Sequence, residues 1–194
     1  MHYQKAREAI LQRLETGLST ELLYHSYQHT LDVVEATERI AVAEKVSGDA
    51  LTWLLSAAVY HDCGFLRTYQ GHEAESCHIA REMLPKYDYQ EQDIDTVCRL
   101  IEATQVPTHP KDKLEEILCD ADSDYLGSED FFKIGRGLYK EFLDQGIVTD
   151  ELSWNQLQLK YLENHRYYTE YSRRKRTKVK HKHMKVIRGL VAGC

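Results

Sequence analysis

Apolar residues recur with helical spacing along most of the chain, and this pattern limits the fold more than any other feature of the sequence. Alternation with a period of two residues, which would indicate β-strands, is nearly absent. We therefore predict an all-α fold, a multi-helix bundle of seven or eight helices. The helices are expected at 3–18, 29–46, 50–62, 71–84, 90–105, 112–125 and 129–144, with a last one running from about 150 into the C-terminal tail.

A single domain accounts for the chain length, because a domain holds about 150 residues and this chain has 194. Only three prolines and ten glycines are present, and no stretch rich in Pro, Gly and Ser divides the chain. Apolar residues make up 42% and charged residues 29% of the sequence, which is near the globular norm and excludes wholesale disorder. The sequence therefore predicts one all-helical domain over 1–194.

The cellular compartment is inferred from the apolar runs and the cysteines. The longest apolar run, Trp53–Tyr60, has eight residues, well short of the roughly 20 that span a bilayer. The N-terminus has no apolar segment behind a basic start, so a secretory signal is not expected. The five cysteines are odd in number and form no Cys-x-x-Cys pair, which favours a reducing compartment. We expect a cytoplasmic protein without a membrane partner.

The charge is divided between an acidic body and a basic tail. Residues 165–194 hold ten Lys/Arg and one acid, a balance of +9, whereas residues 1–164 hold fifteen Lys/Arg and thirty acids, a balance of −15. The tail is interpreted as a basic helix that packs on the acidic body of its own or a neighbouring chain, which allows a homodimer. Binding of the tail to nucleic acid is the less favoured interpretation, because the acidic body opposes it.

His61 and Asp62 end the apolar segment 50–62, which is expected to be the central buried helix. Two ionisable residues there need partners, because burying polar groups without them costs several kcal/mol. A bound cation is one such partner.

Further candidate ligands lie at three other places. His29 starts the preceding helix, His72 follows Gly71, and the acidic residues Asp120, Asp122 and Asp124 follow a short apolar stretch. Two imidazoles and two carboxylates form a mixed nitrogen and oxygen set that suits Mn²⁺, Fe²⁺, Co²⁺, Zn²⁺ or, less well, Mg²⁺. Composition alone leaves open which acidic residues take part.

The order of these residues resembles the HD superfamily of metal-dependent phosphohydrolases. His29 is followed after 32 residues by His61-Asp62, and Asp122 comes 60 residues later, which are gaps typical of small HD domains. The resemblance covers about 20–145 and leaves 146–194 as a C-terminal helical extension with the basic tail. Local matches to the family pattern are His61-Asp62-Cys63-Gly64, Gly71–Ser76, Ile101–Thr104, and Asp120–Asp122 with Tyr125–Gly127.

The resemblance implies a metal site made of His29, His61, Asp62 and Asp122. It implies one divalent ion per chain (Mn, Mg, Co, Ni, Fe or Zn) and hydrolysis of a phosphate ester by metal-activated water. The substrate class implied is a nucleotide or a related phosphorylated small molecule. Asp62, the assigned catalytic residue, or else Asp122 is expected to orient the water and accept its proton.

Two further histidines are candidate proton donors to the leaving oxygen. The spacing from Tyr24 to His29 is similar to the cyclic-nucleotide phosphodiesterase branch, in which the first histidine is the general acid, here His25. Ser26 stands where that branch has Asn, and the chain is far shorter, so its substrate does not carry over. His72 is expected to line the site and is the alternative donor.

Arg67 and Lys111 are predicted to contact the substrate phosphate at the mouth of the site, because a guanidinium fork pairs well with phosphate oxygens. Cys63 is interpreted as a small core residue, since no basic neighbour lowers its pKa. The alternative function is a catalytically silent HD module that binds a nucleotide or a metal as a signal.

Overall fold

The computed structural model describes residues 1–193, which form nine α-helices and three short 3₁₀ helices with no β-strand among them. The all-α class predicted from the helical spacing is therefore confirmed. The α-helices are α1 (Tyr3–Gly17), α2 (Tyr27–Ala43), α3 (Gly48–Tyr60), α4 (His72–Met83), α5 (Glu91–Glu102), α6 (Lys113–Asp122), α7 (Phe131–Asp144), α8 (Glu151–Asn164) and α9 (Glu170–Ala192). The 3₁₀ helices are η1 (Cys63–Leu66), η2 (Leu84–Tyr87) and η3 (Asp124–Gly127).

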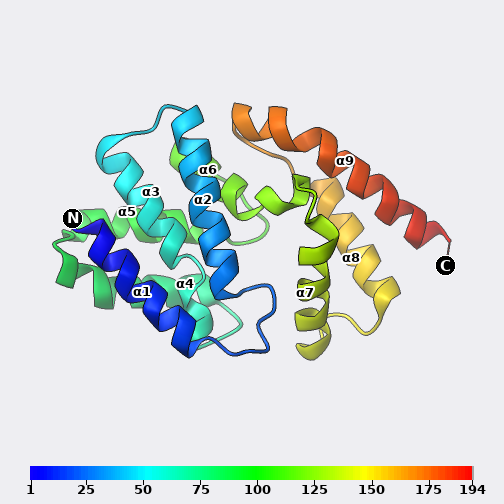
Figure 1. The fold of residues 1–194 in the computed structure, drawn as a ribbon, viewed down its shortest axis with the longest axis horizontal. Coiled ribbons are helices and arrows are strands. Elements are labelled where there is room, and N and C mark those ends of the chain that lie inside the picture. The colour runs from blue at the N-terminus through cyan, green and yellow to red at the C-terminus, as the bar shows by residue number, and fades with distance from the viewer. Residues whose placement is uncertain (194) are drawn as a thin grey trace.

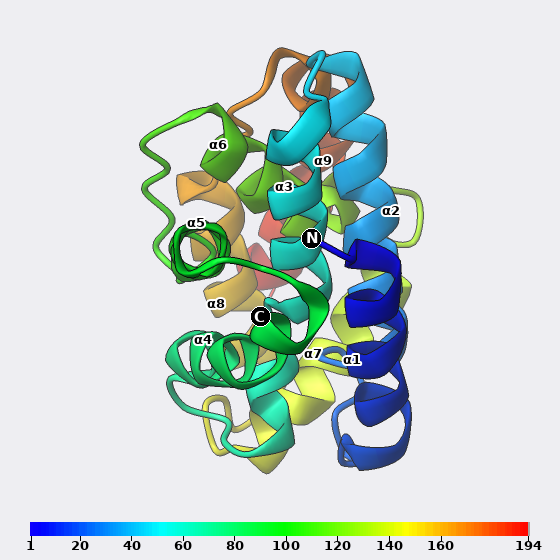
Figure 2. The ribbon, with the colours of Figure 1, turned by 90° about the vertical axis from the view of Figure 1, so that its left-hand side faces the viewer.

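Helix α3 is the central element of the main body, as its nearly continuous apolar sequence predicts. Residues 54–60 are all buried, and α3 packs against α1, α2 and α5. Figure 2 shows α3 with α1 and α2 on one side and α4 and α5 on the other. The main core joins buried side chains of the helices α1–α6. The ends of α2, α3 and α6 are thus held in fixed positions by one continuous core.

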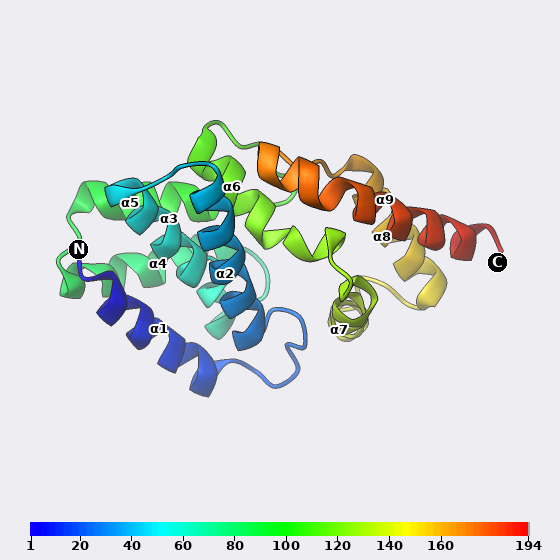
Figure 3. The ribbon, with the colours of Figure 1, turned by 45° about the horizontal axis from the view of Figure 1, so that its top comes forward.

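Helices α7–α9 form a second layer beside this body (Figure 1). A smaller cluster of buried side chains, Leu126, Phe131, Leu162 and Ile187, joins η3 to these three helices. Helix α9 runs along α8 and projects away from the body at its C-terminal end (Figure 3). The two layers meet along η3, which directly follows α6 and its last residue, Asp122.

The segment predicted as one last helix from about 150 is instead two helices, α8 and α9, separated at residues 165–169. This break also explains why the structure has nine α-helices rather than seven or eight. The buried carboxylate of Asp120 accepts hydrogen bonds from the backbone N–H of Tyr168 (2.8 Å) and from the N–H (2.8 Å) and hydroxyl (2.7 Å) of Thr169. Because these backbone N–H groups donate to a residue of α6, they do not form the hydrogen bonds of a continuous helix. A new helix, α9, starts here with Thr169 as its N-cap.

Two basic residues of α9 bind groups elsewhere in the same chain. Arg176 forms an ion pair with Asp124 (2.6 Å), and the buried Lys180 ammonium donates to the backbone carbonyl oxygen of Leu162 (3.1 Å) at the end of α8. This agrees with the interpretation of the tail as a basic helix packed on its own chain. None of the helices within residues 1–193 combines the length and the apolarity needed to cross a membrane.

Candidate metal centre

Three helix ends bring the four predicted metal ligands together. His29 lies in the first turn of α2, where the Ser26 hydroxyl caps the helix by accepting from the His29 N–H (3.3 Å). His61 and Asp62 directly follow α3, and Asp122 is the last residue of α6. The side chains of His29, His61 and Asp62 are buried, whereas that of Asp122 is 24% exposed.

The ligand atoms of these residues face one another at short range. The His29 Nε2 lies 3.2 Å from an Asp122 carboxylate oxygen and 3.5 Å from an Asp62 oxygen. The His61 Nε2 lies 3.2 Å from the same Asp62 oxygen and 3.6 Å from the same Asp122 oxygen. One ligand atom each of His29, His61 and Asp122 thus lies within 4.8 Å of the other two, and the Asp62 oxygen adjoins both histidine nitrogens.

Three of these four atoms have no hydrogen-bond partner within the described residues, namely the Nε2 atoms of His29 and His61 and the Oδ2 of Asp62. The other ring nitrogen of His61, Nδ1, donates to the backbone carbonyl oxygen of Ala58 (2.8 Å), which leaves Nε2 directed at the site. Unpaired buried polar atoms are costly, and a divalent cation would satisfy all of them at once. The residues present therefore fit the expected metal ion.

The electrostatics of the site favour carboxylates facing an imidazolium when no ion is bound. Burial opposes ionisation of Asp62 and Asp122, but the neighbouring histidines outweigh burial and hold the pKa of both carboxyls well below the usual value. Burial likewise opposes the charged form of His61, yet the two carboxylates raise the pKa of His61 well above its usual value. A cation that binds here must therefore displace at least one proton.

Binding of Mn²⁺ to the metal-stripped protein is expected to release protons and to weaken as the pH falls. Below its raised pKa the His61 ring is protonated, so each released proton makes the association constant fall about tenfold per pH unit. Calorimetric titration in two buffers of different ionisation enthalpy counts the protons. Binding that releases no proton and is constant between pH 6 and 8 would contradict this site.

His72 borders the ligand group from the start of α4. Its Nδ1 donates to the backbone carbonyl oxygen of Tyr69 (3.2 Å), and its Nε2 lies 3.5 Å from an Asp62 oxygen. Gly64 makes this approach possible, because a Cβ there would lie 2.0 Å from the backbone oxygen of His72. The structure thus places His72 beside the ligand group, with one nitrogen facing Asp62.

His25 is held beside the same group by a glutamate that the sequence analysis missed. The His25 Nδ1 lies 2.7 Å from the carboxylate of Glu141, whose side chain is buried, and the His25 backbone N–H donates to the other Glu141 oxygen (3.0 Å). The ring of Phe65 stacks on His25 (centroids 4.3 Å apart) and on His72 (4.1 Å). The sequence did offer one indication of this role, since Glu141 is a charged residue on the apolar face of segment 129–144.

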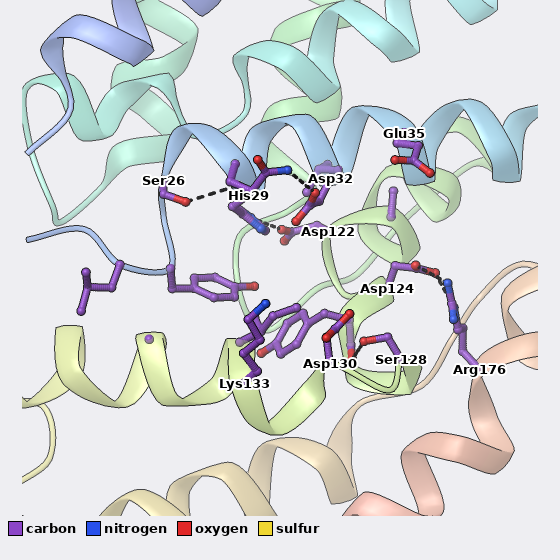
Figure 4. A pocket seen from close by; sticks show the side chains of 18 of the residues that line it. Ser26, His29, Asp32, Glu35, Asp122, Asp124, Ser128, Asp130, Lys133 and Arg176 are labelled. Atoms are coloured by element: carbon purple, nitrogen blue, oxygen red, sulfur yellow. Dashed lines mark hydrogen bonds and ion pairs between the residues drawn. The ribbon is translucent and has the colours of Figure 1, made fainter. Parts of the chain in front are cut away.

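Two cavities adjoin the ligand group. The polar cavity, about 640 Å³, lies between α2, η3, α7 and α9 and is bordered by His29 and Asp122 (Figure 4). The aromatic cavity, about 550 Å³, is bordered by Asp62, Asp122, His25 and His72 and continues to α7 and α8. Asp122 lines both cavities, so the candidate metal centre lies where they meet.

The two cations predicted to contact phosphate lie elsewhere. The Arg67 guanidinium pairs with Glu75 (2.7 Å) and Glu82 (2.8 Å), and neither Arg67 nor Lys111 is among the described residues that line the two cavities. Lys111 is exposed in the segment before α6. The structure therefore does not bring these two residues to the ligand group.

Three other cations, Arg39, Lys133 and Arg176, line the polar cavity. Arg39 and Arg176 both pair with Asp124 (2.7 and 2.6 Å) and are thereby neutralised in part. Lys133 makes no ion pair within the described residues, and Figure 4 shows its amine pointing across the cavity toward His29 and Asp122. Nothing in the sequence distinguishes Lys133 from the other lysines on helix surfaces.

Comparisons with known proteins agree with this geometry. Residues 26–124, about half of the chain, match the model of the HD domain. A predicted HD superfamily hydrolase from an uncultured Thermotogales bacterium is 19% identical, with a TM-score of 0.64 over 99% of this chain and 92% of that chain. A Lactobacillus plantarum protein is 15% identical, with a TM-score of 0.69 over 100% of both chains.

Bacillus subtilis YpgQ, whose crystal structure is a complex with ADP, is 14% identical to this chain. Its TM-score is 0.64 over 97% of this chain and 95% of that chain. No curated protein matches the sequence. The identities are too low to carry an activity over, but the structures share the fold along nearly the whole chain. Together with the match over residues 26–124, they show that this chain belongs to the HD domain family.

Proposed function

We propose that this protein is a metal-dependent phosphohydrolase that cleaves a phosphate ester bond of a nucleotide or a related phosphorylated small molecule. The observation that carries the proposal is the group of unpaired ligand atoms of His29, His61 and Asp62, which lies with Asp122 where the two cavities meet. Membership of the HD domain family supports the reaction class. The ADP bound to YpgQ supports a nucleotide substrate.

The chain's own residues can take the following roles. His29, His61, Asp62 and Asp122 would hold one divalent ion, which would neutralise charge on a phosphoryl oxygen and lower the pKa of a bound water. Asp62 also faces His72, so a proton accepted by Asp62 has a neighbouring imidazole to move to.

His25 is proposed as the general acid that protonates the leaving oxygen. The Glu141 carboxylate accepts a hydrogen bond from the His25 Nδ1–H, which fixes the ring and leaves Nε2 as the atom that can give a proton. Because Glu141 is buried and also accepts the His25 backbone N–H, the His25 ring keeps one orientation. His72, which also stacks on Phe65, is the alternative donor.

Lys133 is proposed to bind the substrate phosphate in place of Arg67 and Lys111. Lys133→Met is expected to raise KM about tenfold with kcat nearly unchanged, because the amine attracts the phosphate in the ground state and the transition state alike. Steady-state kinetics at low salt measures the effect. Lys140→Met is the matched control, because Lys140 is exposed on the same helix and lines neither cavity within the described residues. Equal KM values for the two variants would remove Lys133 from the site.

The proposed activity is tested with metal-stripped protein, to which Mn²⁺, Mg²⁺, Co²⁺, Ni²⁺, Fe²⁺ or Zn²⁺ is returned separately. A panel of nucleoside mono-, di- and triphosphates is supplied together with phenyl phosphate. Metal-dependent release of product is the expected result. A nucleotide that binds tightly with the ion and is recovered unchanged after long incubation would instead favour the silent sensing module.

A further inference from the structure

The aromatic cavity is lined partly by residues outside the segment that matches the HD domain. The match ends at residue 124, whereas Phe142, Trp154, Leu157 and Gln158 belong to α7 and α8. Trp154 is buried and its ring lies 5.8 Å from that of Phe142 in an edge-to-face arrangement. The cavity therefore offers an apolar, ring-lined space that extends from the candidate metal centre into the C-terminal extension.

One polar side chain in this wall has no partner. Gln158 is only 9% exposed, and its Oε1 is fully buried without a hydrogen bond to any described residue. Leaving such a group unpaired destabilises the folded protein, and native proteins contain few of them. An amide presents both an acceptor and a donor edge, so it can pair with a planar ligand that carries both kinds of group.

A second residue with an unpaired polar atom, Tyr69, lines the same cavity and comes from a distant part of the chain. The Tyr69 hydroxyl, between η1 and α4, is buried and has no hydrogen-bond partner within residues 1–193. The Tyr69 ring packs edge-to-face on Phe65 (centroids 5.2 Å apart), so its position is held by the side chain that also stacks on His25 and His72. Two separate chain segments thus each contribute to the lining of one cavity a side chain with an unsatisfied polar atom.

We infer that the aromatic cavity binds the nucleobase of the substrate and that Gln158 and Tyr69 read its polar edge. The inference rests on the proposed function and names the substrate as a nucleotide, with its ring in the aromatic cavity and its phosphate at the metal centre. A volume of about 550 Å³ is in the range of small-molecule sites, which are mostly apolar with a few placed polar groups. A heterocyclic base provides both the flat face that aromatic side chains stack on and the donors and acceptors that an amide requires.

The test uses calorimetric titration of the metal-free protein with adenosine, guanosine, cytidine and uridine, which lack phosphate and so probe the aromatic cavity alone. The intact chain is expected to bind at least one nucleoside in preference to the others. Gln158→Met keeps the length of the side chain but removes the amide. It is expected to weaken binding of the preferred nucleoside about tenfold and to reduce the differences in affinity among the four nucleosides. Tyr69→Phe removes only a hydroxyl and is expected to weaken binding by a smaller factor.

Gln156→Met is the matched control, because Gln156 lies two residues away on α8 and is exposed. It should bind nucleosides as the unsubstituted protein does. Gln158→Met should also raise Tm, since an unpaired buried amide is removed, whereas an amide with a purely structural role would lower Tm on removal. Absence of nucleoside binding at millimolar concentration, or unchanged base preference in both Gln158→Met and Tyr69→Phe, would overturn the inference.

Hydrolysis separates this inference from the proposed function. In Gln158→Met, KM for the preferred nucleotide should rise about tenfold, whereas Gln156→Met should leave it unchanged. Hydrolysis of nucleotides with the same KM in Gln158→Met as in the unsubstituted protein would refute only the base site. Selective nucleoside binding that depends on Gln158, without hydrolysis of any ester, would refute only the phosphohydrolase.

Discussion

Replacing Asp62 with asparagine is expected to lower metal-dependent hydrolysis about a thousandfold or more while the fold survives. Asp62 supplies a ligand oxygen 3.2 Å from the His61 Nε2 and faces His72, so its carboxylate serves both the metal and the proton transfer. Loss of about 4 kcal/mol of transition-state stabilisation, a fair value for a disrupted metal centre, corresponds to roughly that factor. Asparagine retains the shape of the side chain, and circular dichroism checks that the helices persist. His61→Ala is expected to abolish turnover as well.

Asp95→Asn is the control for the loss of one negative charge, because Asp95 is exposed and pairs with Arg81 far from the ligand group. This variant should hydrolyse the substrate at the rate of the unsubstituted protein. If Asp62→Asn kept more than about a tenth of the rate in metal-stripped and reconstituted protein, the metal centre would have to lie elsewhere.

Asp120→Ala is expected to destabilise the protein by about 3 to 5 kcal/mol, because three donors that face a buried carboxylate lose their acceptor. The backbone N–H groups of Tyr168 and Thr169 would be left buried without a partner. The junction between α8 and α9 depends on them, so α9 is expected to detach first. Urea unfolding followed by circular dichroism measures the free energy of unfolding, and hydrogen exchange locates the loss of protection in α9.

Asp150→Ala provides the comparison, since Asp150 also accepts from backbone, at the start of α8, but lies exposed. Its loss should destabilise the protein much less than Asp120→Ala. Equal losses from the two substitutions would mean that the Asp120 carboxylate does not hold the junction.

The four candidate ligands could be named from the sequence because their order resembles that of the HD superfamily. The histidine-aspartate pair was also marked locally, because the apolar run of the central helix ends abruptly before His61. Buried residues 54–60 could likewise be placed in the core from their composition alone. Helix ends and buried stretches of this kind depend on residues that are close together in the sequence, so a single sequence is enough to predict them.

The features that sequence analysis missed depend on contacts between distant segments. The break before α9 is stabilised by Asp120, 48 residues away from Tyr168. His25 is oriented by Glu141 across 116 residues. Hydrophobic periodicity does not predict these pairings. An acidic residue on an otherwise apolar helix face, such as Glu141, is nevertheless a reason to look for a partner.

Arg67 illustrates why cations near a motif are weak predictors of phosphate contacts. It follows the His61-Asp62 pair closely in sequence, yet its guanidinium is held by two glutamates on α4. Lys133, distant in sequence, projects into the polar cavity because α7 lies opposite α2 there (Figure 4). Location in space, set by the packing of the second layer, decides which cation reaches the site.

The central claim is that His29, His61, Asp62 and Asp122 together hold one divalent ion. Crystals of metal-stripped protein soaked in Mn²⁺, with anomalous difference maps calculated from data near the manganese edge, test it directly. We predict one strong peak among these four side chains, within about 2.0–2.3 Å of both Nε2 atoms and the carboxylate oxygens. A site that stays empty at millimolar Mn²⁺, or a peak confined to His181 and His183 on α9, would contradict it.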